Sequence, residues 1–298
     1  MTHKSGFVSI VGRPNVGKST LMNALVGEKL SIITPKPQTT RHRIIGIVNE
    51  DDYQIVFSDT PGIIEDPGYK LQELMNSFVE SALEDSDLLL FMTQPNEVYA
   101  EDAPIIEQLK KVDIPKFLIV NKIDKSHQAQ VQALIDLWQS RVKFNEALAV
   151  SALHAANTTA LIQLILKYLP EGPPYYPKDQ LTDRPERFFV AEIIREKIFE
   201  QFQQEIPYST EVHVESFKET ETKSGEPLIR IHAFIYVERE SQKAIMLGHQ
   251  GKSIKQLGAA ARKALEQWLE TKVFLDLHLK VREKWRKDEQ QLKRFGYK

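Results

Sequence analysis

The sequence predicts two domains of different class: an α/β domain with a mixed, mostly parallel six-stranded sheet, followed by an α+β domain. Three observations lead to this expectation. The first half of the 298 residues alternates short apolar runs with helix-length segments, which is typical of a parallel sheet. A proline-rich stretch then interrupts all regular structure. The remaining residues follow a different order of helices and strands.

Six apolar runs of the first domain have the length and the apolar character of strands. Only four residues, 49–52, separate the second run from the third, so these two strands must form an antiparallel hairpin. Most of the other runs are separated by enough chain for a helix. The expected strands are Phe7–Val11, Ile44–Val48, Tyr53–Ser58, Leu88–Thr93, Lys116–Asn121 and Leu148–Ser151.

The segment Leu169–Pro177 carries four prolines and a glycine, so neither a helix nor a strand can continue through it. We expect the first domain to cover residues 1–172, a linker to cover 173–183 and the second domain to cover 184–298. The second domain should hold a helix from Pro185 to Phe202, three strands and two short helical stretches. Its expected strands are Thr210–Lys218, Leu228–Val237 and Val273–Val281.

Composition excludes several classes of protein. With 42% hydrophobic and 27% charged residues, the chain reads as globular rather than fibrous or disordered. No apolar run approaches the roughly 18 residues of a membrane span, and no secretory signal precedes the first strand. The absence of cysteine excludes a disulfide framework and fits a cytoplasmic protein. The last sixty residues hold 15 basic against 7 acidic residues, so we expect a polyanionic partner there.

The clearest motif matches G-x-x-x-x-G-K-[ST] and lies directly after the first strand, where it opens a helix expected from Thr20 to Val26. Backbone N–H groups of such a loop wrap a phosphate, its lysine reaches the β- and γ-phosphates, and its serine binds Mg²⁺. The alternative is a glycine-rich turn without a ligand. The motif reads Gly12-Arg13-Pro14-Asn15-Val16-Gly17-Lys18-Ser19.

Three further segments follow the ends of expected strands, where open α/β sheets bind ligands. The first supplies a carboxylate for magnesium and a glycine N–H for a γ-phosphate. The second supplies an aspartate that can accept two hydrogen bonds from guanine, which adenine cannot offer, and therefore favours GTP over ATP. The third supplies backbone N–H groups beside the base. They read Asp59-Thr60-Pro61-Gly62, Asn121-Lys122-Ile123-Asp124 and Ser151-Ala152.

On these motifs the first domain resembles the translation-factor-related GTPases and, with the second domain, the Era-type GTPases, whose first switch carries a Thr-Thr-Arg motif found here at Thr39-Thr40-Arg41. The resemblance implies a P-loop GTPase domain that binds GTP or GDP. It implies Mg²⁺ ligands at Ser19, Thr40 and Asp59, and catalytic roles for Lys18, Thr40, Gly62 and Asn15. Taken alone, residues 33–40 also fit an exposed polar loop.

Ile63 occupies the position after Gly62 where Ras-like GTPases hold a water-orienting glutamine. An aliphatic side chain cannot orient water, so we expect slow intrinsic hydrolysis unless another group assists. Related GTPases with an asparagine in the P-loop use K⁺, and Asn15 matches that position, so the resemblance implies K⁺ dependence. A loop-packing role for Asn15 is the alternative.

In the second domain, a G-x-x-G sequence lies between two helical segments and is followed by lysines. Alone it indicates only a turn. Within an α-β-β-α-α-β order it resembles a type II KH domain, whose GXXG loop clamps single-stranded RNA. The resemblance implies RNA contacts at Gly248, His249, Gln250, Gly251, Lys252 and Lys255.

For other residues of the second domain, the sequence is compatible with two roles. Ile245 and Ile254 either line the groove under the bases or pack in the core. The basic run Lys280–Lys287 either touches RNA or forms a solvated end of the chain.

The resemblance covers residues 5 to 295 and implies a GTPase switch that binds 16S ribosomal RNA near its 3′ end and assists maturation of the 30S subunit. It also implies a monomer without DNA binding, located in the cytoplasm with loose association to the inner membrane. Two other functions stay open. One is a GTPase whose C-terminal domain binds protein; the other is a nucleotide-sensing RNA chaperone with negligible hydrolysis.

Overall fold

The computed structural model describes residues 3–297, which divide into two compact units. The first comprises the chain up to Gly68 together with Gln72–Asp183, and the second comprises Tyr69–Leu71 and the chain from Arg184 onward.

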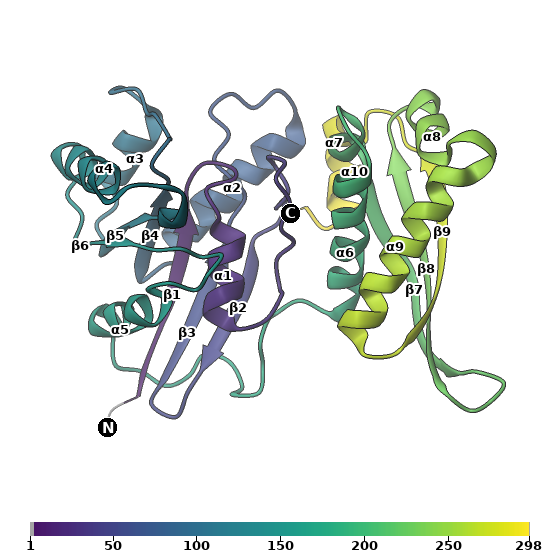
Figure 1. Ribbon diagram of the computed structural model, residues 1–298, viewed down its shortest axis with the longest axis horizontal. Helices are drawn as coiled ribbons and strands as arrows, with labels where there is room; N and C mark the ends of the chain where they lie inside the picture. The colour runs from purple at the N-terminus through teal and green to yellow at the C-terminus, as the bar shows by residue number, and fades with distance from the viewer. Residues whose placement is uncertain (1–2, 298) are drawn as a thin grey trace. The chain divides into compact units, whose positions relative to one another are not determined.

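The first unit is built on a six-stranded sheet in the order β2-β3-β1-β4-β5-β6 (Figure 1). All neighbours pair in parallel except β2 and β3, which form an antiparallel hairpin. The α/β expectation with one edge hairpin is therefore confirmed. The strands are β1 Lys4–Val11, β2 Ile44–Asn49, β3 Tyr53–Asp59, β4 Leu88–Thr93, β5 Lys116–Val120 and β6 Glu146–Ala149.

Helices cover both faces of this sheet (Figure 1). Buried residues of α2, α3 and α4, among them Val79, Leu109 and Trp138, form one apolar core with β4 and β5, while α1 and α5 pack together on the other face. The helices are α1 Lys18–Val26, α2 Lys70–Glu84, α3 Pro104–Lys111, the short 3₁₀ turn η1 Ile123–Lys125, α4 Gln128–Arg141 and α5 Thr158–Tyr168.

The parallel strands end together at one edge of the sheet. Ile10 pairs with Asp59 across β1 and β3, and Val11 pairs with Phe91 across β1 and β4. The loops that follow these strands therefore meet at this edge, as the rule for open α/β sheets requires. This shared edge brings the sequence motifs together.

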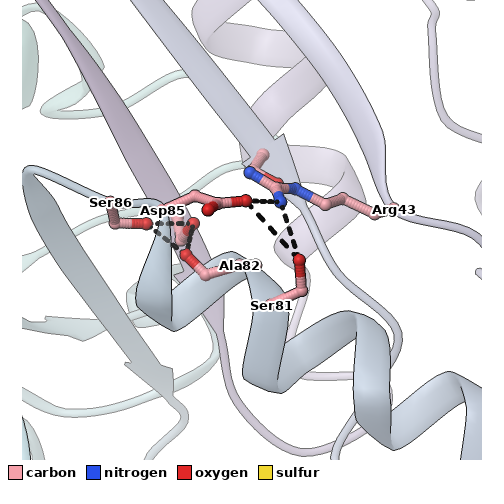
Figure 2. A network of polar contacts seen from close by, with 7 residues as sticks. Arg43, Ser81, Ala82, Asp85 and Ser86 are labelled. Atoms are coloured by element: carbon pink, nitrogen blue, oxygen red, sulfur yellow. Dashed lines mark hydrogen bonds and ion pairs between the residues drawn. The ribbon is translucent and has the colours of Figure 1, made fainter.

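Arg43 fixes the chain just before β2. Its Nε donates to Ser58 Oγ at 2.7 Å on β3, and its Nη1 donates to Asp85 Oδ2 at 2.8 Å beyond the end of α2. Figure 2 shows the guanidinium group pointing at Asp85 and Ser81, while Ser86 bonds the carbonyl group of Ala82. The loop that carries Thr40 is thereby anchored at its C-terminal end.

The proline-rich residues after α5 pass the starts of β1 and β3, and the chain then reaches the edge strand β2. Ser5 Oγ donates to the Pro173 carbonyl at 2.6 Å, Gln54 Nε2 donates to the Tyr176 carbonyl at 2.8 Å, and the Ile47 amide donates to the Leu181 carbonyl at 2.8 Å. Residues 173–183, expected as a linker, therefore pack on the first unit.

Several boundaries differ from the sequence expectation by one to three residues, and two of them bear on the site. The structure begins α1 at Lys18 rather than Thr20, because the P-loop turns directly into helix after Gly17. It ends β6 at Ala149 rather than Ser151. Ser151 instead forms an isolated bridge with Ala156, so it leaves the sheet and enters a tight loop.

The second unit has a three-stranded sheet in the order β7-β8-β9, in which β7 and β8 are antiparallel and β8 and β9 parallel. Helices α6 and α9 pack on one face of it, over a core that includes Ile194, Ile231 and Leu265 (Figure 1). The predicted α+β class is confirmed. The elements are α6 Glu186–Gln201, α7 Ile206–Ser209, β7 Glu211–Glu221, β8 Pro227–Val237, α8 Glu240–Leu247, η2 His249–Gly251, α9 Lys252–Leu269, β9 Lys272–Val281, η3 Trp285–Lys287 and α10 Glu289–Arg294.

Candidate functional site

A cavity of about 420 Å³ opens at the strand-end edge of the first unit. The P-loop and the Asn121–Asp124 segment both line it, so a ligand with anionic and planar parts can meet both. The sequence-predicted residues that line it are Pro14, Asn15, Gly17, Lys18, Ser19, Thr40, Gly62, Asn121, Lys122 and Asp124.

Lys18 holds a buried positive charge in the P-loop. Its Nζ donates to the carbonyl oxygens of Gly12 and Arg13, both at 3.0 Å. Burial lowers the pKa of its ammonium group to about 8, although the carboxylates of Asp59 and Glu97 act in the opposite direction. A phosphate group bound at this loop would stabilise the charged form of the lysine.

Three side chains with oxygen atoms that can bind a metal ion, each from a different segment, meet beside Lys18. Ser19 Oγ donates to Asp59 Oδ2 at 2.7 Å and lies 2.9 Å from Thr40 Oγ1. The other carboxylate oxygen, Asp59 Oδ1, is buried and has no hydrogen-bond partner among the described residues. Burial raises the pKa of Asp59, against the effects of Lys18 and Ser19. A hard divalent cation such as Mg²⁺ fits this set, because it prefers oxygen ligands and would stabilise the buried carboxylate.

The Asn121–Asp124 segment presents a fixed carboxylate to the cavity. Ser151 Oγ donates to Asp124 Oδ1 at 2.5 Å, and this hydrogen bond lowers the pKa of Asp124. Asn121 Nδ2 donates to the Val16 carbonyl at 2.8 Å, while its Oδ1 accepts from the Ala152 amide at 2.9 Å. The segment is therefore tied to the P-loop on one side and to the loop after β6 on the other.

Some predicted residues lie at the site without lining the cavity. The Arg13 guanidinium pairs with Glu65 and stacks 3.9 Å above the Tyr99 ring. Val16 is fully buried, and Ile63 packs against the core of the sheet. Thr60 Oγ1 donates to the Ile10 carbonyl at 2.8 Å. These side chains support the loops and leave their backbone groups to face a ligand.

Sequence reasoning missed part of the cavity wall. The first-switch loop contributes a wall that mixes apolar with polar side chains, and the loop after β6 contributes Leu153, which is 67% exposed. No signal in the sequence pointed to Leu153, because single apolar residues are common on protein surfaces. The missed residues are Thr20, Ile32, Ile33, Thr34, Pro35, Gln38, Thr39, Lys125 and Leu153.

The GXXG sequence forms the turn between α8 and α9. Gly248 has φ 68°, and a Cβ atom there would lie 2.2 Å from Ser253 Oγ, so only glycine fits. The side chains of His249 and Gln250 are exposed at the tip of the turn. Lys252 opens α9, and Lys255, one turn later, is exposed as well.

A groove of about 340 Å³ lies between α9 and β9. Apart from Lys255 and Arg262, its lining is apolar or small. Ile254 lines the groove and also packs against the core, whereas Ile245 is 53% exposed and does not line it. Sequence reasoning missed four residues of the groove, Gly258, Ala259, Leu275 and Leu277. The alternation of Leu275 and Leu277 with polar residues indicated only that one face of their strand is buried.

Within residues 3–297, no helix combines the length and the apolar character that crossing a membrane requires.

Family models match both units. A model described as 50S ribosome-binding GTPase matches residues 7–122, and a KH domain model matches residues 205–286. The chain is 48% identical over 295 residues to GTPase Era of Syntrophus aciditrophicus, covering 99% of this chain and 95% of that protein. It is 46% identical over 298 residues to GTPase Era of Thermoanaerobacter sp., covering 100% and 97%.

Two solved structures are similar over 99% of both chains. One is a variant of Aquifex aeolicus Era bound to GDP and AlF₄⁻, with a TM-score of 0.92 and 39% identity. The other is Era in complex with MgGDPNP and nucleotides 1506–1542 of 16S ribosomal RNA, with a TM-score of 0.93 and 40% identity. With this similarity over its full length, and with a P-loop unit followed by a KH unit, the chain belongs to the Era family of GTPases.

Proposed function

We propose that this protein is a GTP-hydrolysing switch that binds 16S ribosomal RNA near its 3′ end and assists maturation of the 30S subunit. The observation that carries the proposal is that Lys18 and the Asp124 carboxylate line the same cavity. An ammonium group in a phosphate-binding loop suits the triphosphate, and a carboxylate acceptor suits guanine. The second unit supplies a GXXG turn beside a groove.

Ser19, Thr40 and Asp59 would hold Mg²⁺, which supplies a positive charge that offsets the charge of the phosphates. Lys18 supplies a second positive charge at the P-loop. Gly62 lines the cavity and presents its backbone N–H to the γ-phosphate. Thr40 closes the first switch over the phosphates, and its release after hydrolysis is the switching step.

Ile63 packs against the core of the sheet and cannot orient the attacking water. Another group must therefore orient this water. Asn15 lines the cavity and would hold K⁺ there through its side-chain oxygen, because its Nδ2 is engaged with the Pro35 carbonyl at 3.0 Å. The ion would offset charge that builds up during hydrolysis.

The second unit would hold single-stranded RNA. Two glycines at Gly248 and Gly251 allow the phosphate backbone to approach the turn, and Lys252 and Lys255 supply positive charge beside it. The groove between α9 and β9 would receive the bases. We also propose that the protein acts as a monomer on the 30S subunit in the cytoplasm, without DNA binding and with loose contact to the inner membrane. The family likeness supports these features, and the basic C-terminal region supports contact with an anionic partner.

Single-turnover GTP hydrolysis, measured with and without the 3′-terminal segment of 16S ribosomal RNA, tests the switch. We expect hydrolysis in both cases and a different rate when RNA is bound. Absence of hydrolysis under both conditions would favour the nucleotide-sensing RNA chaperone.

A double substitution, His249→Asp with Gln250→Asp, tests the RNA site. Both glycines stay, so the turn should persist, but two carboxylates then face a polyanion. We expect RNA affinity to fall at least ~10-fold at moderate salt while GDP affinity stays unchanged. His213→Asp adds a carboxylate on β7, away from the turn, and serves as the control. Unchanged RNA affinity in the double variant would favour a protein partner for this unit.

A further inference from the structure

The sheet of the second unit has a face that α6 and α9 do not cover. Ile231 and Ala233 of β8 point into the core, so His232 between them points to the opposite face. On β9 the core-facing residues Leu275 and Leu277 alternate with Asp276 and His278 in the same way. The β8–β9 register pairs His232 directly with Asp276. Two imidazoles and one carboxylate therefore share the open face.

The three side chains converge on one point. Asp276 Oδ2 lies 2.9 Å from His232 Nδ1 and 3.0 Å from His278 Nε2, so a single carboxylate oxygen contacts both rings. No two of the three ligand atoms are more than 4.8 Å apart. The imidazole rings themselves lie 4.8 Å apart between centroids. This convergence brings three donor atoms into one small volume.

The surroundings leave the cluster reachable from solvent. Each of the three side chains keeps between 34% and 50% of its surface exposed. The Phe234 ring lies beside both imidazoles and forms a wall on one side. The ammonium group of Lys280 lies 3.3 Å from the centroid of the Phe234 ring. A small ion can reach the cluster without any movement of the backbone.

We propose that His232, Asp276 and His278 form a binding site for a divalent transition-metal ion, with Zn²⁺ as the expected occupant. Two nitrogen donors and one oxygen donor suit Zn²⁺, Co²⁺ or Ni²⁺ rather than Mg²⁺, which prefers oxygen ligands. Ligand atoms about 2.1 Å from a tetrahedral ion stand about 3.4 Å apart, so the contacts of 2.9 and 3.0 Å to Asp276 Oδ2 need to widen by only about 0.5 Å. Rotation of the exposed rings brings all three atoms onto the ion.

Binding replaces hydrogen bonds by metal bonds. Without the ion, the rings share hydrogen bonds with the carboxylate. With the ion, His232 Nδ1 and His278 Nε2 present lone pairs, and each neutral ring carries its single proton on its other nitrogen. Water completes the coordination. The bound ion cross-links β8 to β9 on the face opposite α6 and α9. This site differs in donor chemistry from the all-oxygen set at Ser19, Thr40 and Asp59.

Calorimetric titration of the full chain with ZnCl₂ tests the proposal. The protein carries no histidine tag and no nucleotide, and Mg²⁺ is in excess so that oxygen sites are occupied. We expect one Zn²⁺ per chain. His232→Asn, Asp276→Asn and His278→Phe should each lower the affinity at least ~100-fold, because even the loss of a residue that only supports a ligand costs 10–100-fold.

His213 provides the matched control. It lies on β7 of the same sheet and has one nearby acidic partner, Glu215 Oε2 at 3.7 Å, so it belongs to a pair rather than a triad. His213→Asn should therefore keep the Zn²⁺ affinity of the unchanged protein. Equal loss of affinity in His213→Asn, or full affinity in any one of the three ligand variants, would overturn the site.

A measurement on the unchanged protein needs no variant. In nitrogen-detected nuclear magnetic resonance, Zn²⁺ should shift the ring signals of His232 and His278 together at a one-to-one ratio and leave the ring of His213 in place. Signals of both rings that stay fixed throughout the titration would show that the cluster is a set of hydrogen bonds only and would refute the proposal. Mg²⁺ alone should shift neither ring.

Discussion

A Cβ atom on Gly17 would lie 2.3 Å from Nδ2 of Asn121. The P-loop and the base-selecting segment therefore touch through a glycine, and the same Asn121 amide donates to the carbonyl of the preceding residue, Val16, at 2.8 Å. Gly17 also has φ 105°, a conformation that L residues rarely adopt. The close contact fixes the distance between the phosphate end and the base end of the cavity.

Gly17→Ala should push Asn121 away and lower GDP affinity at least ~10-fold, because a misplaced binding group costs that much or more. Gly27→Ala is the matched control: Gly27 has φ 83°, and no atom lies within 4 Å of the point where its Cβ atom would stand. Both variants should lose about 1–2 kcal/mol of unfolding free energy to backbone strain. Calorimetry should show weakened GDP binding in Gly17→Ala alone; equal affinities in the two variants would contradict the role of this contact.

Asp124→Asn should change the base that the site prefers from guanine to xanthine. The carboxylate accepts from guanine N1–H and the exocyclic amine, whereas the amide would donate to the carbonyl of xanthine. We expect GTP affinity to fall at least ~100-fold and xanthosine triphosphate to bind better than GTP. Asp136→Asn, on the exposed surface of α4, should change neither affinity. Continued preference for GTP in Asp124→Asn would show that another group selects the base.

Nucleotide affinity should depend on pH through Lys18. Its pKa is about 8 because burial disfavours the charged form, and bound phosphates would raise it. GDP binding above pH 8 is therefore accompanied by uptake of a proton. The affinity for GDP is highest below that pH and falls as the pH rises through it, by up to ~10-fold per pH unit. Calorimetry between pH 7 and 9 in buffers of different ionisation enthalpy measures the uptake.

Lys18→Arg supplies the control for this linkage, since a guanidinium group stays charged throughout that range. Its GDP binding should show no proton uptake at pH 8.5. The GDP affinity of the unchanged protein could instead stay constant from pH 7 to 9, with the same heat of binding in every buffer. That result would mean that Lys18 is already fully charged before nucleotide binds.

Potassium should accelerate GTP hydrolysis relative to sodium at matched ionic strength, and Asn15→Ala should remove the difference. Asn157→Ala is a matched control, because Asn157 has φ 64° against 65° for Asn15 but lies at the start of α5. It should share the backbone strain and keep the potassium effect. Equal rates in the two salts would exclude the ion, and a potassium effect that survives in Asn15→Ala would place it on other ligands.

Much of the fold could be predicted because apolar runs mark strands directly. Even so, β6 lies two residues earlier than expected, at Glu146–Ala149, all of them only partly buried. An edge strand of this kind has no alternation to mark its ends. The Asn145 amide, which donates to the Lys116 carbonyl at 2.9 Å, helps to set its start, and that partner lies 29 residues away in the sequence.

Contacts between loops could not be predicted. The motif placed Arg13 in the phosphate loop, but its side chain pairs with Glu65 and stacks on Tyr99, which lie 52 and 86 residues further along the chain. The same holds for the cluster on the second sheet. Alternation along β9 put Asp276 and His278 on one face, but only the register with β8 adds His232. Such arrangements depend on tertiary pairing, which periodicity does not encode.

The segment that runs along β2 also protects the molecule from unwanted association. β2 is the outermost strand, and its outward amide at Ile47 is occupied by the Leu181 carbonyl, with Asn49 Nδ2 bonded to the Gln180 carbonyl at 3.1 Å. An uncovered edge strand is a template for intermolecular sheet growth. A fragment of the first unit that stops at residue 172 would leave this edge bare and should aggregate, whereas one that continues to residue 183 should stay monodisperse.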